Sequence, residues 1–132
     1  MPHNGARAVL IVEDSENSAA TLEIALLAIP GVSVLLAASA LEALRILDRA
    51  GEPVSAVVTD LNMPRMDGFE LIQRIREDRR LASVPIVVVS ADTDPATPQR
   101  VAALGACAFF PKPYSPAEVR RKLEQLLDAG LH

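Results

Sequence analysis

The chain has 132 residues, of which 50% are hydrophobic, and a formal net charge of -4; this predicts one globular domain with an aliphatic core. The acidic balance argues against a nucleic-acid-binding surface, because phosphate contacts need clustered lysine and arginine. One cysteine rules out an intrachain disulfide framework, and the N-terminal region has no signal-like or membrane-spanning apolar run, so we expect a cytoplasmic protein without membrane association.

Short apolar runs alternate along the chain with segments whose apolar residues have helical spacing. The predicted strands are residues 8–13, 32–37, 56–60, 85–89 and 107–110. The predicted helices are residues 15–29 and 39–51, a third beginning at Asp67, a short fourth ending at Gly105, and a fifth over 115–130. This alternation predicts an α/β fold, a doubly wound parallel sheet of five strands with five helices, as in flavodoxin-like proteins. We expect a single domain over residues 1–132, with its core about 7–128.

Helix starts carry a repeated capping pattern, in which a Ser or Asp precedes a Glu by three residues. The pattern occurs at residues 39–42, 67–70 and 115–118. The short fourth helix is less regular, because Pro95 and Pro98 are tolerated only within its first turn. Two other features have structural interpretations: Cys107 as a small buried side chain, and the basic run 74–80 as a solvated helix face.

Polar side chains gather where the predicted strands end. Asp60 follows the third strand, the pair Glu13-Asp14 closes the first, Ser90 follows the fourth, and Lys112 follows the fifth. Open parallel sheets bind ligands at this edge. Three carboxylates sharing a site repel each other unless a cation neutralises them, and an all-oxygen ligand set suits Mg²⁺, with Mn²⁺ as a substitute. The sequence therefore predicts a site for a divalent metal and a phosphoryl group.

Each of these residues also has a plainer interpretation. The acidic pair could cap the first helix, and Ser90 could form a local turn. Lys112 could be a surface lysine, although Pro111 and Pro113 on either side hold it on a stiff turn where it can pair with Asp60.

The motifs at the strand ends resemble those of receiver domains of two-component response regulators, including single-domain regulators like those of chemotaxis. The resemblance covers residues 7–128. It rests on Glu13-Asp14, Asp60 followed by Met63-Pro64 and Asp67-Gly68, Ser90-Ala91, and Lys112-Pro113.

The resemblance implies that Asp60 accepts a phosphoryl group from a histidine kinase or phosphotransfer protein. It implies that Asp14 binds Mg²⁺ directly and Glu13 largely through water. It further implies that Ser90 and Lys112 bind the phosphoryl oxygens. A protein of this kind catalyses only its own phosphorylation and dephosphorylation and is not otherwise an enzyme.

The resemblance also assigns regulatory positions. Phe109 stands at the aromatic switch position without a phenolic hydroxyl, and Asn62 and Asp92 tune the phosphoryl lifetime. Independently of the resemblance, Asn62 lies in the loop two residues after Asp60 and could lend its backbone carbonyl to the metal. A homodimer or a downstream partner would use the face of the fourth helix, fifth strand and fifth helix, where the prolines of the fourth helix depart from the family pattern. Residues near Val101, Ala108 and Tyr114 are a candidate contact surface, although core packing accounts equally well for Val101.

Three alternatives remain open at this stage. The chain could be a receiver cut from a larger kinase or DNA-binding regulator, although Met1 and the ending Leu131-His132 favour a stand-alone protein. A magnesium-dependent phosphatase with an aspartyl nucleophile would need an acid/base residue where Asn62 stands. A flavin or nucleotide binder would need a glycine-rich loop where residues 13–15 carry acids.

Overall fold

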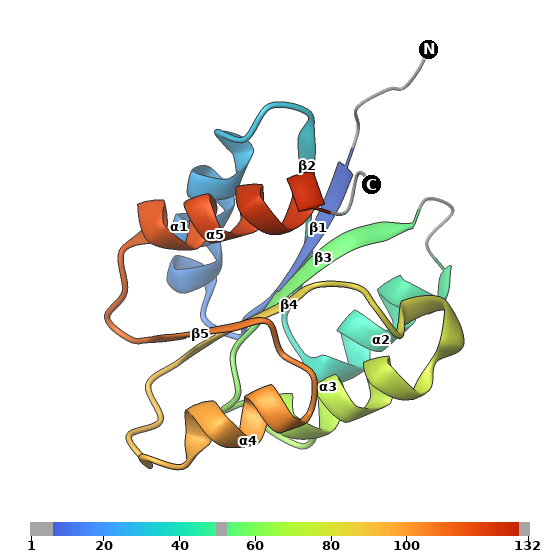
Figure 1. Cartoon of the computed structure of the whole chain (residues 1–132), viewed down its shortest axis with the longest axis vertical. Helices are drawn as coiled ribbons and strands as arrows, with labels where there is room; N and C mark the ends of the chain where they lie inside the picture. The colour runs from blue at the N-terminus through green and yellow to red at the C-terminus, as the bar shows by residue number, and fades with distance from the viewer. Residues whose placement is uncertain (1–6, 50–52, 130–132) are drawn as a thin grey trace.

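The computed structural model describes residues 7–49 and 53–129, which form one five-stranded parallel sheet with helices on both faces (Figure 1). The strands are β1 (Arg7–Val12), β2 (Val32–Ala37), β3 (Val54–Thr59), β4 (Ile86–Ser90) and β5 (Ala108–Pro111). Their order in the sheet is β2-β1-β3-β4-β5, so β2 and β5 form the two edges. The predicted α/β fold is confirmed.

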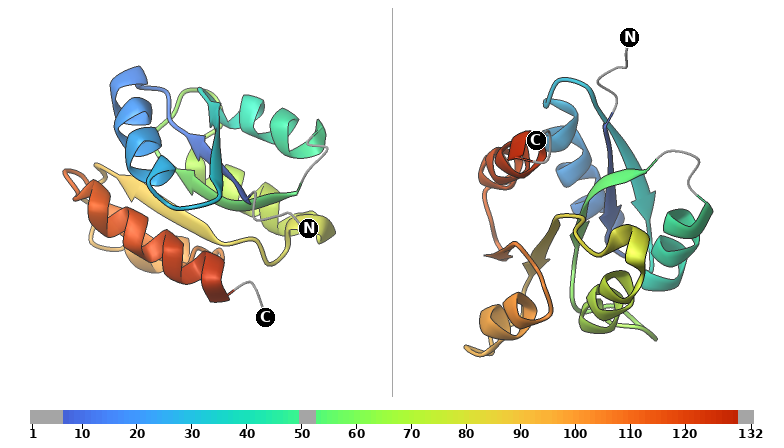
Figure 2. Two further views of the ribbon diagram at one scale, coloured as in Figure 1. Left: turned by 90° about the horizontal axis from the view of Figure 1, so that it is seen from above. Right: turned by 45° about the vertical axis from the view of Figure 1, so that its right-hand side comes forward.

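Helices α1 and α5 cover one face of the sheet, and α2, α3 and α4 cover the other (Figures 1 and 2). The helices are α1 (Glu16–Leu27), α2 (Ala40–Arg49), α3 (Gly68–Glu77), the 3₁₀ turn η1 (Arg79–Leu81), α4 (Thr97–Ala103) and α5 (Pro116–Ala129). Among the described helices, none is both long and apolar enough to cross a lipid bilayer.

The alternation of side chains along β1 shows how the two layers share the core. Val9 and Ile11 pack against α1 and α5, whereas Leu10 and Val12 pack on the layer of α2, α3 and α4, and all four are fully buried. Because both faces of the strand are covered, nearly every position along it is apolar. This burial on both sides explains why the central strands have continuous hydrophobic sequences.

The Ser and Asp half of each capping pattern forms as expected, whereas among the described residues the Glu side chain accepts a backbone amide only at α2, where Glu42 binds the Ala38 amide. The amide of Glu42 donates to Ser39 Oγ at 3.1 Å, and the amide of Glu70 donates to Asp67 Oδ1 at 2.9 Å. In α5 the Ser115 hydroxyl accepts from the amide at position 118. The first helix is capped by Ser15, whose side chain accepts from the Ser18 amide, and Glu13 Oε2 accepts from the Ser15 amide at 3.2 Å, so Glu13 also contributes to the start of this helix.

Three expectations about local structure were wrong. The basic run is not a single helix face: α3 ends at Glu77, Asp78 caps η1, and Arg76 is half-buried, donating to the carbonyls of Leu81 and Gly105. Cys107 is exposed rather than buried, because it lies just before β5 begins. The strand limits also differ by one or two residues, since β1 ends before Glu13 and β3 begins at Val54. The predicted helix ends at Gly51 and Gly130 lie outside the described residues.

Candidate functional site

The site lies at the carboxyl ends of β1 and β3, where the sheet order changes direction. The helix after β1 covers one face and the helix after β3 covers the other, so the two strand ends form the switch point at which open α/β sheets bind ligands; we call this place the crevice. The Asp60 amide donates to the Val12 carbonyl at 3.0 Å, so the ladder continues one step beyond β3. This bond holds Asp60 at the mouth of the crevice with only 6% of its surface exposed.

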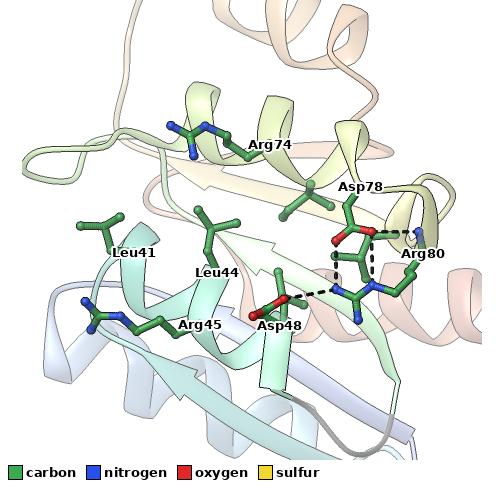
Figure 3. Close-up of a pocket in the computed structure, with 10 residues that line it drawn as sticks. Leu41, Leu44, Arg45, Asp48, Arg74, Asp78 and Arg80 are labelled. Carbon is green, nitrogen blue, oxygen red and sulfur yellow. Dashed lines mark hydrogen bonds and ion pairs between the residues drawn. The ribbon is translucent and has the colours of Figure 1, made fainter.

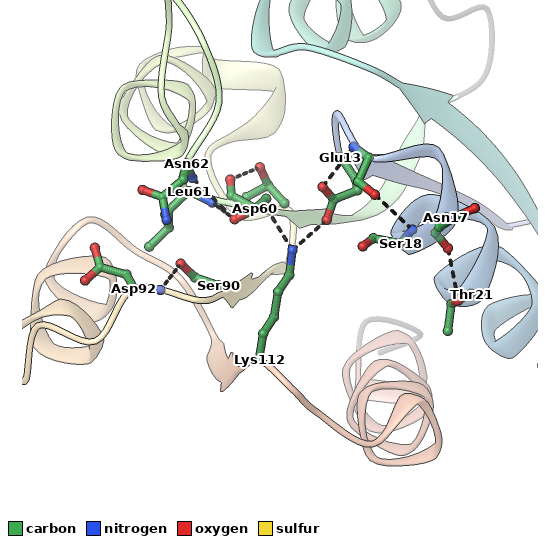
Figure 4. Close-up of polar contacts among 12 residues, drawn as sticks. Glu13, Asn17, Ser18, Thr21, Asp60, Leu61, Asn62, Ser90, Asp92 and Lys112 are labelled. Atoms are coloured by element: carbon green, nitrogen blue, oxygen red, sulfur yellow. Dashed lines mark hydrogen bonds and ion pairs between the residues drawn. The ribbon is translucent and has the colours of Figure 1, made fainter.

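Lys112 joins two carboxylates across this crevice (Figure 4). Its Nζ donates to Asp60 Oδ2 and to Glu13 Oε1, both at 2.9 Å. The lysine backbone is fixed by a 2.7 Å bond from its amide to the Ser90 carbonyl, and the peptide bond to Pro113 is cis. The sequence predicted the pair with Asp60, but not the equally short pair with Glu13.

The other oxygen of Asp60 is held by the backbone. Oδ1 accepts from the Leu61 amide at 2.6 Å and from the Asn62 amide at 3.3 Å. The two carboxylate oxygens therefore have different partners, and the side chain is held in one orientation.

Gly68 lets the loop after β3 fold back against the strand end. Its amide donates to the Leu61 carbonyl at 2.8 Å, and a Cβ at this position would lie 2.3 Å from the Asp60 carbonyl oxygen. Sequence reasoning noted Gly68 only as part of a motif and missed its packing role. The available signal was a glycine at the first position of a helix, where it is a poor helix former.

Three acidic side chains could hold a metal ion. Glu13, Asp14 and Asp60 each offer a carboxylate oxygen, and these oxygens lie within 4.8 Å of one another. Glu13 and Asp60 are buried, whereas Asp14 is exposed and open to an ion entering from solvent. This all-oxygen set fits a hard divalent cation such as Mg²⁺.

Burial and ion pairing shift the pKa values of Glu13 and Lys112 in opposite directions. Burial raises the pKa of Glu13, and the hydrogen bonds from Lys112 and Ser15 offset this only in part. For Lys112, burial lowers the pKa, but the hydrogen bonds to Asp60 and Glu13 outweigh it, and the net pKa is raised. The lysine therefore stays charged, and it is the cation that stabilises two adjacent carboxylates.

Ser90 and Asp92 lie at the end of β4, beside the crevice (Figure 4). Ser90 is fully buried, and its Oγ accepts from the Asp92 amide at 3.0 Å, as the turn-forming interpretation predicted. That bond uses a lone pair of the hydroxyl and leaves its proton available for another acceptor. The exposed Asn62 lies at the crevice too, whereas the role of its carbonyl stays a prediction.

The predicted switch and contact residues lie farther from the carboxylates. Phe109 is half-buried against the core layer of α2, α3 and α4 and lies opposite Val88 in the register of β4 and β5. Val101 is a core residue with 1% of its surface exposed, so the packing interpretation holds. Ala108 and Tyr114 are half-buried and remain candidate contact positions.

Comparison with known proteins places this site in a family. The model of the response regulator receiver domain matches residues 9–124. A CheY homologue, a chemotaxis protein of Campylobacter jejuni, is 30% identical over 122 residues, covering 92% of this chain and 93% of that protein. Chemotaxis protein CheY1 of Helicobacter pylori is 29% identical over 119 residues, covering 90% and 95%. The structure of the chemotaxis response regulator CheY4 of Vibrio cholerae superposes with a TM-score of 0.81 at 29% identity, covering 92% and 98%. Fold, crevice and sequence together show that the chain belongs to the response regulator receiver family.

Proposed function

We propose that this chain is a single phosphoacceptor domain of a two-component system in the cytoplasm, in which Asp60 takes a phosphoryl group from a histidine kinase or phosphotransfer protein. The observation that carries the proposal is the arrangement around Asp60. One of its oxygens is fixed by backbone amides, the other contacts Lys112, and two further carboxylates lie beside it. A nucleophile, a cation for the phosphoryl oxygens and a metal-binding set thus share one crevice.

In the proposed transfer, a carboxylate oxygen of Asp60 attacks phosphorus while the bond from phosphorus to the donor nitrogen breaks on the opposite side. The nitrogen keeps the bonding electron pair, and Asp60 becomes an acyl phosphate. Lys112 exchanges its bond to Asp60 Oδ2 for one to a phosphoryl oxygen. A Mg²⁺ ion held by Asp14, Asp60 and the Asn62 carbonyl, with Glu13 acting through water, would supply further charge neutralisation.

The phosphoryl group adds about 1.5 to 2 negative charges and needs a hydrogen-bond donor that Asp60 did not need. The Ser90 hydroxyl can supply that proton, and its movement toward the phosphoryl group opens space for Phe109 to turn inward. This shifts the population of two conformations and changes the surface of α4, β5 and α5, which a downstream partner or a second copy would recognise. Asn62 and Asp92 border the phosphoryl group and set how fast water removes it.

Intact mass after incubation with acetyl phosphate tests the proposal. The protein should gain one phosphoryl group when Mg²⁺ is present and none when the metal is chelated. Asp60→Asn should gain none under either condition. If the wild-type protein stays unmodified while Asp60→Asn has the same fold, the phosphoacceptor proposal is wrong. We expect no turnover of phosphate monoesters, because Asn62 stands where a phosphatase of this type needs an acid/base residue.

A further inference from the structure

The edge strand β2 is unprotected. Its sequence over residues 32–37, Val-Ser-Val-Leu-Leu-Ala, contains neither a charged residue nor a proline, and among the described residues it pairs with β1 on one side only. Edge strands usually carry such residues because an open row of amides and carbonyls pairs readily with another strand. The opposite edge follows this rule, since β5 has only four residues and ends at Pro111.

Two exposed apolar side chains belong to this edge strand itself. Within the described residues, every large hydrophobic side chain that is exposed lies between residues 24 and 41. Leu35 and Leu36 of β2 are 36% and 44% exposed, and Leu27 of α1 is 51% exposed. The described parts of α4, β5 and α5 contribute none. An open strand edge with exposed leucines on both of its faces is typical of a surface that pairs with another extended strand.

The helix α2 presents a charged stripe toward this edge. Its residues Leu41, Leu44 and Arg45 face α3 across a hollow of about 360 Å³ (Figure 3). Glu42 instead lines a hollow beside Leu36 of β2. Ile46 and Arg49 follow Glu42 by four and seven positions and therefore lie on the same helix face, with Ile46 partly buried against the core; Glu42, Ile46 and Arg49 form the stripe. The stripe therefore has an acid at one end, an apolar residue in the middle and a base at the other end.

We propose that β2 pairs antiparallel with β2 of a second copy of this chain, about a two-fold axis perpendicular to the sheet. This symmetry places the α2 helices of the two copies side by side in opposite directions. Glu42 of each copy then faces Arg49 of the other, and Ile46 lies near the axis. The stripe is thus complementary to itself, which identifies a second copy as the occupant.

A parallel pairing of the two edges is less favourable. It would bring together the ends of the sheets that carry Glu16, Glu23 and Glu42, which line one hollow beside Leu36. The antiparallel pairing moves Glu16 and Glu42 of the two copies to opposite ends of the interface. This interface lies on the opposite edge of the sheet from β5.

Sedimentation equilibrium of the unphosphorylated protein tests the proposal, with the monomer mass of 14.1 kDa as the reference. We expect a species of twice that mass. Leu35→Lys, at an exposed position, should yield a folded monomer by circular dichroism. Glu42→Arg and Arg49→Glu should each raise the dimer Kd on the order of tenfold, and the double variant should recover most of the loss.

Two controls separate the interface from other effects. Glu42→Gln keeps an oxygen that can accept the Ala38 amide, so it tests charge without removing the cap. Arg121→Glu makes the same charge reversal at an exposed position of α5 and should leave the Kd unchanged. The proposal is overturned if the wild type sediments only as a monomer across the concentration range. It is also overturned if Arg121→Glu weakens the dimer while Leu35→Lys does not, because the dimer would then use another face.

Discussion

Replacing Lys112 by methionine should leave two buried carboxylates facing each other without their cation. The side chains of Glu13 and Asp60 are only 1% and 8% exposed, and Lys112 is 23% exposed. Both carboxylates contact the same Nζ in the native protein. Methionine has a similar length and flexibility, so the substitution removes charge and hydrogen bonds more than volume.

The cost can be worked out in two ways. Carboxylate oxygens within 4.8 Å repel by about 3.5 kcal/mol at an effective dielectric of about 20. Alternatively, Glu13 can take up a proton, which near pH 7.5 costs about 4 kcal/mol for a carboxyl of ordinary pKa 4.5. The smaller of these two free-energy costs limits the effect, so we expect Lys112→Met to lower the free energy of unfolding by about 3 kcal/mol. Near pH 5 protonation of Glu13 costs only about 1 kcal/mol, so the stability lost in Lys112→Met should be correspondingly smaller.

Urea unfolding in the presence of a chelator, near pH 7.5 and near pH 5, measures both values. Adding Mg²⁺ should stabilise the variant more than the wild type, because the ion takes over the role of the missing cation. The double variant Lys112→Met, Glu13→Gln should regain most of the loss, since one of the two charges is gone. Lys122→Met in α5 is the matched control. Equal stability of Lys112→Met and wild type at both pH values would refute the reasoning.

Three further predictions concern the same framework. Gly68→Ala should lower the free energy of unfolding by about 1–3 kcal/mol, because its Cβ would meet the Asp60 carbonyl oxygen at 2.3 Å. An unchanged urea midpoint would contradict this, because the loop would then accommodate the methyl group without strain. Arg76→Leu should lower the free energy of unfolding by about 2 kcal/mol, because the carbonyls of Leu81 and Gly105 lose a charged donor. Amide hydrogen exchange should become faster in the α4–β5 loop, and unchanged exchange there would contradict this prediction. The raised pKa of Lys112 adds stability that is fully present below its ordinary value of 10.5 and is lost as pH rises through the folded pKa. The stability difference between wild type and Lys112→Met should therefore narrow in alkaline urea titrations without metal, and a constant difference would count against the ion pairs.

The fold and the centre of the site could be predicted because their signals are local. Runs of apolar residues mark the buried strands, and the polar residue that ends each run falls at one edge of a parallel sheet. Asp60, Glu13 and Lys112 come together for this reason, although they are far apart in the sequence.

Other features depend on contacts that no local pattern encodes. Arg76 lies in a basic run typical of a solvated helix, yet its guanidinium reaches the Gly105 carbonyl, 29 residues away in the sequence. Cys107 looked like core by residue type, but its exposure depends on where β5 begins. The packing of Gly68 against Asp60 and the bond between Lys112 and Glu13 follow from how two loops meet, which only the structure shows.

The account depends most directly on which residue carries the phosphoryl group. Borohydride reduces an acyl phosphate to an alcohol, so a phosphorylated aspartate becomes homoserine and can be located by peptide sequencing in a mass spectrometer. After treatment with acetyl phosphate and Mg²⁺, we predict homoserine at position 60 and at no other aspartate, with none when the metal is chelated. Homoserine at Asp14 in place of Asp60, or a phosphoryl group that borohydride does not reduce, would contradict the account.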